Sequence, residues 1–336
     1  MTVDPRQLHP DGALKRMKEL YTARSQTYME WVAGDWELRE ECRQQVTCYL
    51  CGHADSRPFL KAAGFRYVAC TGCGLVYVNP RLRDELIGEF YQSDAYQFMF
   101  ENMLMKSVDY RLAVVAQRKF DSVARCVRSG NPRVLDVGCG IGEFLSIAKA
   151  HGWQTIGIEF SPRAVAFARR NFGLDVLTQP VKECGFAAGE FDLATMWGVL
   201  EHLTNPLEVM SDVRQCLADD GLLAVEVPSY DCLLVRYLRH RPEQADRIVD
   251  GWGHLMLFSQ PLICRMLTES GFEVLETNSL GLDVATMLRY LSEADPVVAD
   301  HPLYQFCVEN QVGLQGYLES THQADMIRVV ARKKGQ

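Results

Sequence analysis

The sequence lacks the features that would direct a chain into a membrane or a secretory pathway. No run approaches the ~18 apolar residues of a membrane-spanning helix, and the first residues carry no basic and apolar secretory signal. We therefore expect a cytoplasmic protein with no membrane partner. Internal repeats and low-complexity linkers are also missing. With 336 residues, 48% of them hydrophobic and 23% charged, the chain exceeds one average domain and has ordinary globular composition.

Positive charge is also scarce. The formal net charge is −8 and the isoelectric point about 5.6, whereas enzymes that act on nucleic acids usually present a broad basic surface. This balance does not favour a nucleic-acid partner. Twelve cysteines, in contrast, are a conspicuous presence. Without a secretory signal they are not expected to form disulfides.

A glycine-rich turn is the most informative positive feature. A short apolar run from Arg133 ends at Asp136 and breaks into Gly138, Gly140 and Gly142 before helical spacing resumes at Phe144. Glycine permits positive φ and lets backbone N–H groups approach a ligand without a Cβ in the way. The order is neither the Gly-x-Gly-x-x-Gly of dinucleotide folds nor a phosphate-binding loop ending in Gly-Lys-Ser/Thr. A cofactor other than NAD or ATP is expected.

This acid followed by three glycines resembles the first motif of the class I S-adenosylmethionine-dependent methyltransferases. One helix further on, a second short strand ends at Glu159-Phe160, followed by Ser161-Pro162 as the start of a helix. The resemblance implies that Asp136 and the three glycines contact S-adenosylmethionine. It also implies that Glu159 accepts hydrogen bonds from the ribose hydroxyls and that Phe160 lies on the adenine.

The later segments keep the order of the same family. Apolar runs at 174–178, 191–197, 221–228, 271–276 and 326–332 supply further strands, and Glu201-His202-Leu-x-x-Pro follows the fourth strand. We expect an α/β fold with a doubly wound, mostly parallel seven-stranded sheet. Trp197 is expected beside the cofactor. Gly198 stands where relatives often have Asp, and it would open space beside the transferable methyl group.

Two Cys-x-x-Cys pairs form a second motif, upstream of the glycine turn. Eighteen residues separate the two pairs, a spacing that places four thiolates around one tetrahedral Zn²⁺; the predicted ligands are Cys48, Cys51, Cys70 and Cys73. An iron–sulfur cluster could use the same four ligands. Four cysteines leave no open position for water or substrate, so the predicted metal is structural. The sequence around the second pair resembles bacterial methyltransferases, several acting on sugars or natural products, with an N-terminal zinc ribbon.

The predicted ribbon differs in charge from the rest of the chain. Between Arg43 and Arg83 there are six basic residues and one acid, a formal +5, so the remainder carries −13. A basic module beside the cofactor domain could hold an anionic small molecule, although the same arginines could be solvated surface. The expected organisation is an N-terminal helical segment (1–41), the zinc ribbon (42–83), a helical linker (84–128) and the methyltransferase domain (129–336). A helical insertion at about 280–321 could serve as a lid or an oligomer contact.

Two histidines are candidate general bases. His202 follows the fourth strand at the ligand-binding edge of such sheets, and His254 lies in a His-Leu-x-x-Phe-Ser phrase that recurs in this family. Imidazole can accept a hydroxyl proton near neutral pH. The resemblance implies methyl transfer to a small molecule, most plausibly O-methylation of a sugar, a nucleotide-linked sugar or a natural product. C-methylation of a keto-sugar, methylation of rRNA or tRNA bases, and a silent cofactor-binding module stay open.

Overall fold

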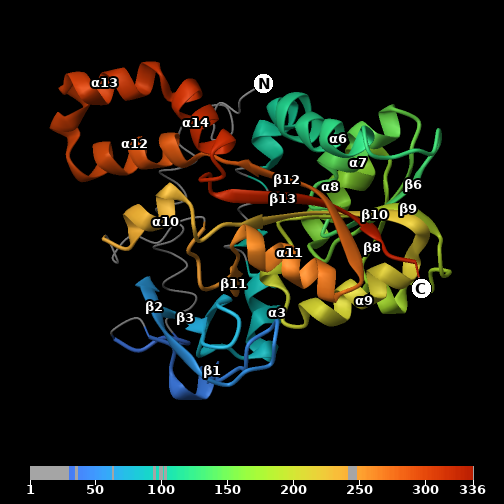
Figure 1. Cartoon of the computed structure of the whole chain (residues 1–336), viewed down its shortest axis with the longest axis horizontal. Helices are drawn as coiled ribbons and strands as arrows, with labels where there is room; N and C mark the ends of the chain where they lie inside the picture. The colour runs from blue at the N-terminus through green and yellow to red at the C-terminus, as the bar shows by residue number, and fades with distance from the viewer. Residues whose placement is uncertain are drawn as a thin grey trace.

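The computed structural model describes residues 30–335 except 35–36, 63, 94–95, 98–100, 102–103 and 241–247. Most of the N-terminal segment predicted to be helical over 1–41 lies outside the described residues; η1 (Glu40–Cys42) closes it. Figure 1 shows a central sheet flanked by helices, a smaller sheet with blue strands (β2 and β3, over 56–70) below it, and a group of helices (α12 to α14, over 283–320) that extends away from both.

The central sheet has seven strands in the order β12-β13-β10-β9-β6-β7-β8. Strand β13 is antiparallel to both neighbours, and the other recorded pairings are parallel. The strands are β6 (Arg133–Val137), β7 (Gln154–Ile158), β8 (Asp175–Leu177), β9 (Phe191–Trp197), β10 (Leu217–Pro228), β12 (Phe272–Leu280) and β13 (Met326–Lys333). This sheet confirms the predicted fold class. The central strands are near-continuous buried apolar runs because helices cover both faces.

Each face of the sheet has its own apolar core. Side chains of α6 (Gln117–Ala124), α7 (Glu143–Ala150) and α8 (Pro162–Phe172) form one cluster. Those of α9 (Pro206–Cys216) and α11 (Gln260–Glu269) form another with the opposite face. Short elements η5 (Val181–Glu183), η6 (Leu200–His202) and α10 (Leu233–Leu238) lie in the connections. Among the described helices, none combines the length and apolar character needed to cross a bilayer.

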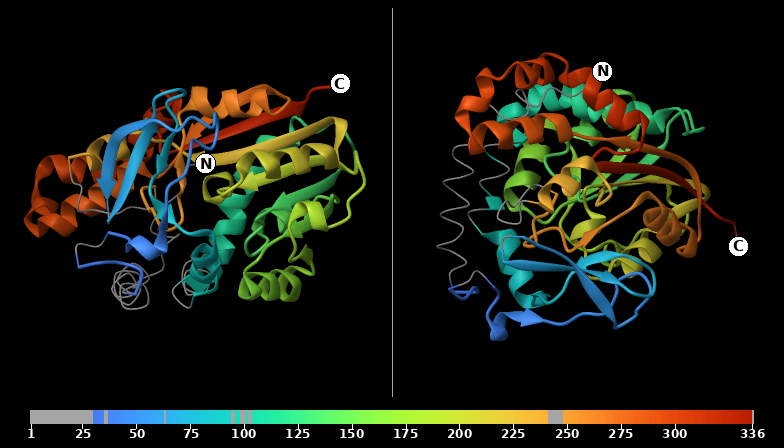
Figure 2. Two further views of the ribbon diagram at one scale, coloured as in Figure 1. Left: turned by 90° about the horizontal axis from the view of Figure 1, so that it is seen from below. Right: turned by 60° about the vertical axis from the view of Figure 1, so that its left-hand side comes forward.

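The smaller sheet joins the N-terminal region to the part of the chain that carries the central sheet. Its order is β11-β4-β3-β2, from β2 (Ser56–Ala62), β3 (Phe65–Cys70), β4 (Val76–Val78) and the distant β11 (Met256–Leu257). A pair of short strands, β1 (Arg43–Gln44) and β5 (Arg81–Leu82), lies beside it. Because β11 pairs with β4 through Met256–Tyr77 and Leu257–Val76, the segment carrying His254 is part of this sheet. Figure 2 shows the blue strands of this sheet beside the part of the chain that carries the central sheet.

The linker between the two sheets is helical. It contains α3 (Asp84–Gln92), η3 (Met105–Ser107), α5 (Val108–Tyr110) and the π-helical η4 (Arg111–Ala116), which runs into α6. The sequence predicted a helical linker over 84–128. The structure has 3₁₀, α and π turns in succession from residue 105 to residue 124. The wider π turn is at Arg111, whose guanidinium pairs with Glu143 of α7.

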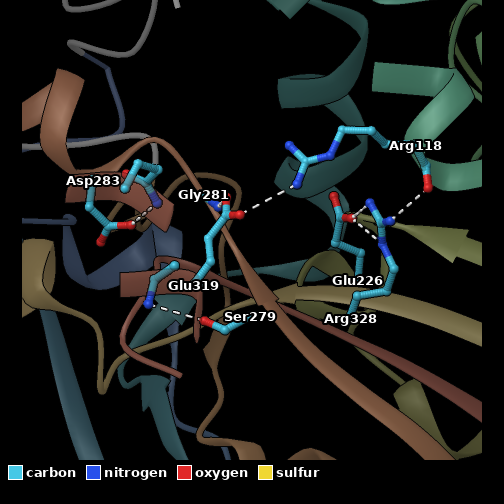
Figure 3. Close-up of polar contacts among 9 residues, drawn as sticks. Arg118, Glu226, Ser279, Gly281, Asp283, Glu319 and Arg328 are labelled. Carbon is cyan, nitrogen blue, oxygen red and sulfur yellow. Dashed lines mark hydrogen bonds and ion pairs between the residues drawn. The ribbon is translucent and has the colours of Figure 1, made fainter. Parts of the chain in front are cut away.

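The insertion between β12 and β13 consists of α12 (Asp283–Ala294), η7 (Pro296–Asp300), α13 (Pro302–Glu309) and α14 (Gln311–Ser320), as Figure 1 shows. Its base is fixed by polar contacts (Figure 3). Glu319 accepts the Gly281 amide at 3.3 Å and pairs with Arg118 of α6 at 3.6 Å. Arg328 of β13 pairs with Glu226 at 2.6 Å and donates to the Arg118 carbonyl at 3.1 Å. The insertion is thereby tied to the helix beside the glycine turn.

Candidate active site and cysteine cluster

The glycine turn connects β6 to α7, as predicted. All three glycines have positive φ: 70° at Gly138, 56° at Gly140 and 83° at Gly142. A Cβ on Gly138 would lie 2.5 Å from Val199, and one on Gly142 would lie 2.4 Å from Leu174, so these two are glycines partly for packing. A Cβ on Gly140 would meet nothing within 4 Å. Gly140 is therefore the position where the backbone faces open space.

Two acids flank this turn in different ways. Asp136 is the last but one residue of β6, is buried, and accepts a 2.6 Å hydrogen bond from the Thr195 hydroxyl. Burial raises the pKa of its carboxyl to about 7. Glu159 follows β7 and accepts hydrogen bonds from the amides of Gly140 at 2.9 Å and Ser161 at 2.8 Å. Burial raises the pKa of Glu159, against those backbone hydrogen bonds.

Aromatic side chains lie at the ends of the neighbouring strands. Phe160, next to Glu159, exposes 61% of its surface, which leaves an apolar face free for a flat ligand. Trp197 ends β9, packs edge-on against Phe144, and has Lys119 and Arg328 over its ring. Its indole N–H has no partner among the described residues. Of the two cations over the Trp197 ring, Arg328 is paired with Glu226. Lys119 has no carboxylate within ion-pair distance among the described residues.

The two predicted histidines lie together around a buried acid. Glu201 Oε1 is 4.0 Å from Nε2 of His202 and 4.0 Å from Nε2 of His254, and the imidazole centroids are 4.8 Å apart. His202 Nδ1 lies 2.8 Å from the Gly253 carbonyl, and His254 Nδ1 lies 2.9 Å from the Ile248 carbonyl. A carbonyl oxygen can only accept a hydrogen bond, so we place hydrogen on Nδ1 of both rings, which leaves each Nε2 as an acceptor directed toward Glu201.

Burial disfavours the charged forms of two members of this cluster, Glu201 and His202. The pKa of the Glu201 carboxyl is raised to about 8 by burial, and its Oε2 has no hydrogen-bond partner among the described residues. The pKa of His202 is lowered to about 3, first by burial and then by the neighbouring His254. A neutral carboxyl and a neutral His202 are therefore expected at pH 7. His254 is held further by the Tyr67 hydroxyl, which donates to the His254 carbonyl at 3.0 Å.

Sequence reasoning missed two members of this cluster. Glu201 stood in the Glu-His phrase without a role, and Tyr91 was not among the predicted site residues. The Tyr91 hydroxyl lies 3.1 Å from His202 Nδ1, at the far end of α3. Gly198 has φ 72°, and a Cβ there would lie 3.6 Å from Glu201 Oε1. The space predicted beside Gly198 thus opens next to the buried carboxyl.

The four predicted cysteine ligands meet at one end of the small sheet. Cys48 Sγ is 3.4 Å from Cys73 Sγ, Cys51 Sγ is 3.5 Å from Cys70 Sγ, and all four sulfurs lie within 4.8 Å of one another. Each knuckle turns on a glycine with positive φ, Gly52 at 70° and Gly74 at 84°. Their amides donate to the Cys48 and Cys70 carbonyls at 2.8 and 3.0 Å. Both knuckles therefore have the same local backbone.

Comparison with known proteins places the chain in a family. The family Methyltransf_23, described as a methyltransferase domain, matches residues 108–277, half of the chain. The chain belongs to this methyltransferase family. It is 30% identical over 151 residues to an uncharacterized 37.1 kDa protein in a transposon of Streptomyces fradiae, covering 41% of this chain and 44% of that protein.

Other relatives and structures are more distant or shorter in coverage. A ubiquinone biosynthesis O-methyltransferase of Xanthomonas campestris is 35% identical over 112 residues, covering 31% of this chain and 46% of that enzyme. The chain thus spans less than half the length of these curated relatives. A SAM-dependent methyltransferase structure from Archaeoglobus fulgidus has a TM-score of 0.48 at 18% identity, covering 71% of this chain and all of that one.

Proposed function

We propose that this methyltransferase-family protein transfers a methyl group from S-adenosylmethionine to a hydroxyl of a small molecule, such as a sugar, a nucleotide-linked sugar or a natural product. The observation that carries the proposal is the pair of imidazoles around the buried Glu201, at the strand edge that also holds the glycine turn. That pair offers a proton acceptor beside the space at Gly198. The RNA alternative has less support because the chain carries a net negative charge.

The residues around the glycine turn fit the proposed cofactor. Gly140 leaves space for it, Glu159 offers carboxylate oxygens to ribose hydroxyls, and exposed Phe160 offers a face for adenine. Lys119 would hold a carboxylate, since its ammonium has no recorded ion pair among the described residues. The cofactor supplies an electrophilic methyl on a sulfonium. The protein must align the acceptor oxygen with that methyl and take up the proton of the hydroxyl.

His254 is the better candidate for taking that proton. A base whose pKa is depressed as far as that of His202 accepts protons poorly at neutral pH. His254 Nε2 is an acceptor held in place by the Nδ1 contact to Ile248 and by the strand pairing of the next residues. We assign His254 Nε2 as the proton acceptor. His202, held by Gly253 and Tyr91, would orient the acceptor hydroxyl.

Cofactor binding tests the first half of the proposal. Calorimetry with S-adenosylmethionine should give a one-to-one complex with the wild-type protein, and none with Gly140→Val, because branched carbons would fill the open side of the turn. Asp136→Ala should likewise abolish binding. Unchanged affinity in both variants would refute the assignment of this turn to the cofactor.

Turnover tests the second half. Purified protein is incubated with S-adenosylmethionine and a panel of metabolites and nucleotide sugars, and S-adenosylhomocysteine is measured. With an acceptor found, His254→Ala should lower turnover about 10²- to 10⁴-fold, the range of general base catalysis, while cofactor affinity stays near wild type. The matched control is His240→Ala, at an exposed position. Equal activity of the His254 and His240 variants would remove His254 from the role.

We also propose that the cysteine cluster binds a structural Zn²⁺. Zn–S bonds of about 2.3 Å in a tetrahedron put sulfurs about 3.8 Å apart, close to the observed separations. Four thiolates at these separations would repel one another without a cation between them. Metal analysis of purified protein should find one equivalent of zinc, and Cys70→Ser should lose it. Wild-type protein with neither zinc nor iron would refute a metal site.

A further inference from the structure

The histidine cluster brings three atoms that can ligate a metal around one small gap. Glu201 Oε1 lies 4.0 Å from Nε2 of His202 and 4.0 Å from Nε2 of His254. One ligand atom from each of the three residues lies within 4.8 Å of the other two. A separation of 4.0 Å is too long for a direct hydrogen bond. The three side chains therefore face one another across a space that no bond between these atoms closes.

Backbone carbonyls orient both imidazoles toward this gap. Nδ1 of His202 lies 2.8 Å from the Gly253 carbonyl, and Nδ1 of His254 lies 2.9 Å from the Ile248 carbonyl. With hydrogen placed on Nδ1, the lone pair of each ring is on Nε2, the atom that faces Glu201. A histidine that binds a metal typically donates its other ring N–H to a carbonyl or a carboxylate, which fixes the tautomer and the orientation of the ring. Both imidazoles have this arrangement.

The carboxyl is buried, but the gap in front of it is accessible. The Glu201 side chain is 2% exposed, and its Oε2 is enclosed without a hydrogen-bond partner in the described part of the chain. Oε1 faces the histidines, and a Cβ built on Gly198 would meet it at 3.6 Å, with no nearer atom among the described residues. The side chains of His202 and His254 are 27% and 15% exposed. A small ion can therefore enter along the imidazole edges.

We propose that Glu201 Oε1, His202 Nε2 and His254 Nε2 bind one divalent transition-metal ion, with Zn²⁺ as the best match. Two imidazoles and one carboxylate are an established ligand set for Zn²⁺, which then keeps a fourth position open. Ligand atoms at 2.0–2.2 Å in a tetrahedron are about 3.4 Å apart, so the observed separations would close by roughly half an ångström on binding. Mg²⁺ and Ca²⁺ prefer oxygen ligands, and the two imidazoles disfavour them.

This metal would inhibit methyl transfer, a consequence that rests on the proposed function. His254 Nε2 has one lone pair, so it cannot bind a metal and accept the proton of a substrate hydroxyl at the same time. The metal would also displace the proton that Glu201 carries in the metal-free protein, because only the carboxylate coordinates. Proton uptake by His254 therefore belongs to the metal-free chain. The proposed site is distinct from the cysteine cluster, which uses none of these residues.

Metal binding can be measured without any turnover. The full chain is freed of loosely bound metal with a weak chelator and is then titrated with Zn²⁺ by calorimetry and with Co²⁺ by absorption spectroscopy. We expect one saturable equivalent outside the cysteine cluster. Cobalt held by two imidazoles and a carboxylate gives weak visible bands, whereas cobalt in the cysteine cluster adds an intense thiolate charge-transfer band. The spectrum therefore tells the two sites apart.

Variants of the ligands test which residues hold the metal. Glu201→Gln and His254→Gln each remove one ligand, and each should weaken binding by more than the ten- to hundredfold that is typical of losing an outer partner of a ligand. The matched control is His240→Gln, at an exposed position, which should bind like the wild type. The proposal is overturned if the wild type binds no metal outside the cysteine cluster. It is also overturned if both ligand variants, shown to be folded by circular dichroism, bind as tightly as the wild type.

Turnover tests the inhibition separately. With an acceptor found, methyl transfer should fall in proportion to the occupancy of the site by Zn²⁺, and a chelator should restore it. Unchanged or increased turnover of the metal-saturated protein would overturn the inhibition. If no acceptor is methylated at all, the proposed function fails, and the titrations and their variants still decide whether the metal site exists.

Discussion

The buried acid between two histidines is the residue that most changes the picture of the site. Glu201 is enclosed by η6, and its carboxyl keeps its proton because burial penalises the charged form. A neutral Glu201 beside the neutral His202 imidazole avoids placing an unpaired charge in the interior. It also holds a proton next to His254 Nε2 when that nitrogen takes another from a substrate. Glu201 thus has a stability consequence and a catalytic one, and they can be measured separately.

Stability against pH isolates the first. The folded-state pKa of Glu201 is about 8 against an ordinary value of 4.5. Below about pH 4.5 the carboxyl is protonated in both states; between there and pH 8 only the unfolded chain releases the proton. The folded state therefore loses about 1.4 kcal/mol per pH unit over this window. Glu201→Gln cannot titrate, so its free energy of unfolding should rise relative to wild type from pH 5 to pH 8 in urea titrations. A difference independent of pH would contradict the assignment.

The glycines of the turn also separate at the residue scale. Gly138→Ala combines positive φ with a Cβ 2.5 Å from Val199, and should lower the free energy of unfolding by about 2–4 kcal/mol. Gly140→Ala has the same strain but open space, so about 1–2 kcal/mol is expected. Affinity for S-adenosylmethionine should fall in Gly140→Ala despite its milder destabilisation. Urea unfolding and calorimetry on both variants check this. Equal stability losses would mean that Val199 moves aside.

At the scale of elements, local patterns predicted what local chemistry determines. The strand ending at Asp136, the following glycines and the next strand ending before Glu159 were readable because buried parallel strands are apolar and the turn needs glycine. The cysteine knuckles were readable because two Cys-x-x-Cys pairs at this separation are typical of a metal site. The pairing of β11 with β4 and the contact between Tyr91 and His202 could not be predicted, because they join segments 111 to 181 residues apart in sequence. Only packing brings these segments together, so no spacing in the sequence reports them.

The β4–β11 pairing yields a prediction for the zinc ribbon. If metal holds the ribbon, its removal should loosen β3 and β4 and, through the pairing of Met256 with Tyr77, the segment that carries His254. Hydrogen exchange after chelation, or in Cys70→Ser, should show lost protection over both 65–78 and 253–259. Strand β8 at the far edge of the large sheet is the internal control and should keep its protection. Loss of protection confined to 65–78 would show that β11 does not depend on the ribbon for its stability.

At the scale of the whole molecule, the insertion is the part with the least burial. Helix α13 has no buried residue, and five apolar side chains of the insertion expose more than half of their surface: Val297, Leu303, Phe306, Val312 and Tyr317. Apolar residues scattered singly need no explanation, but several on one small group of helices indicate a contact surface. We expect the contact to be a second copy of this chain, because two-fold symmetric pairs are the commonest assemblies.

Self-association through this surface is directly measurable. The wild-type chain should sediment as a dimer at micromolar concentration. Phe306→Asp places a charge on the apolar surface and should raise the dissociation constant of the dimer at least tenfold. Position 306 carries no recorded side-chain hydrogen bond and lies 54% exposed, so the fold itself should survive the change. Leu207→Asp, at an exposed apolar position of α9, which Figure 1 draws away from α13, serves as the control and should leave the dimer intact. A monomeric wild type, or equal dissociation in both variants, would show that the insertion is not the contact, and its apolar surface would then have to be explained by the acceptor or by another protein.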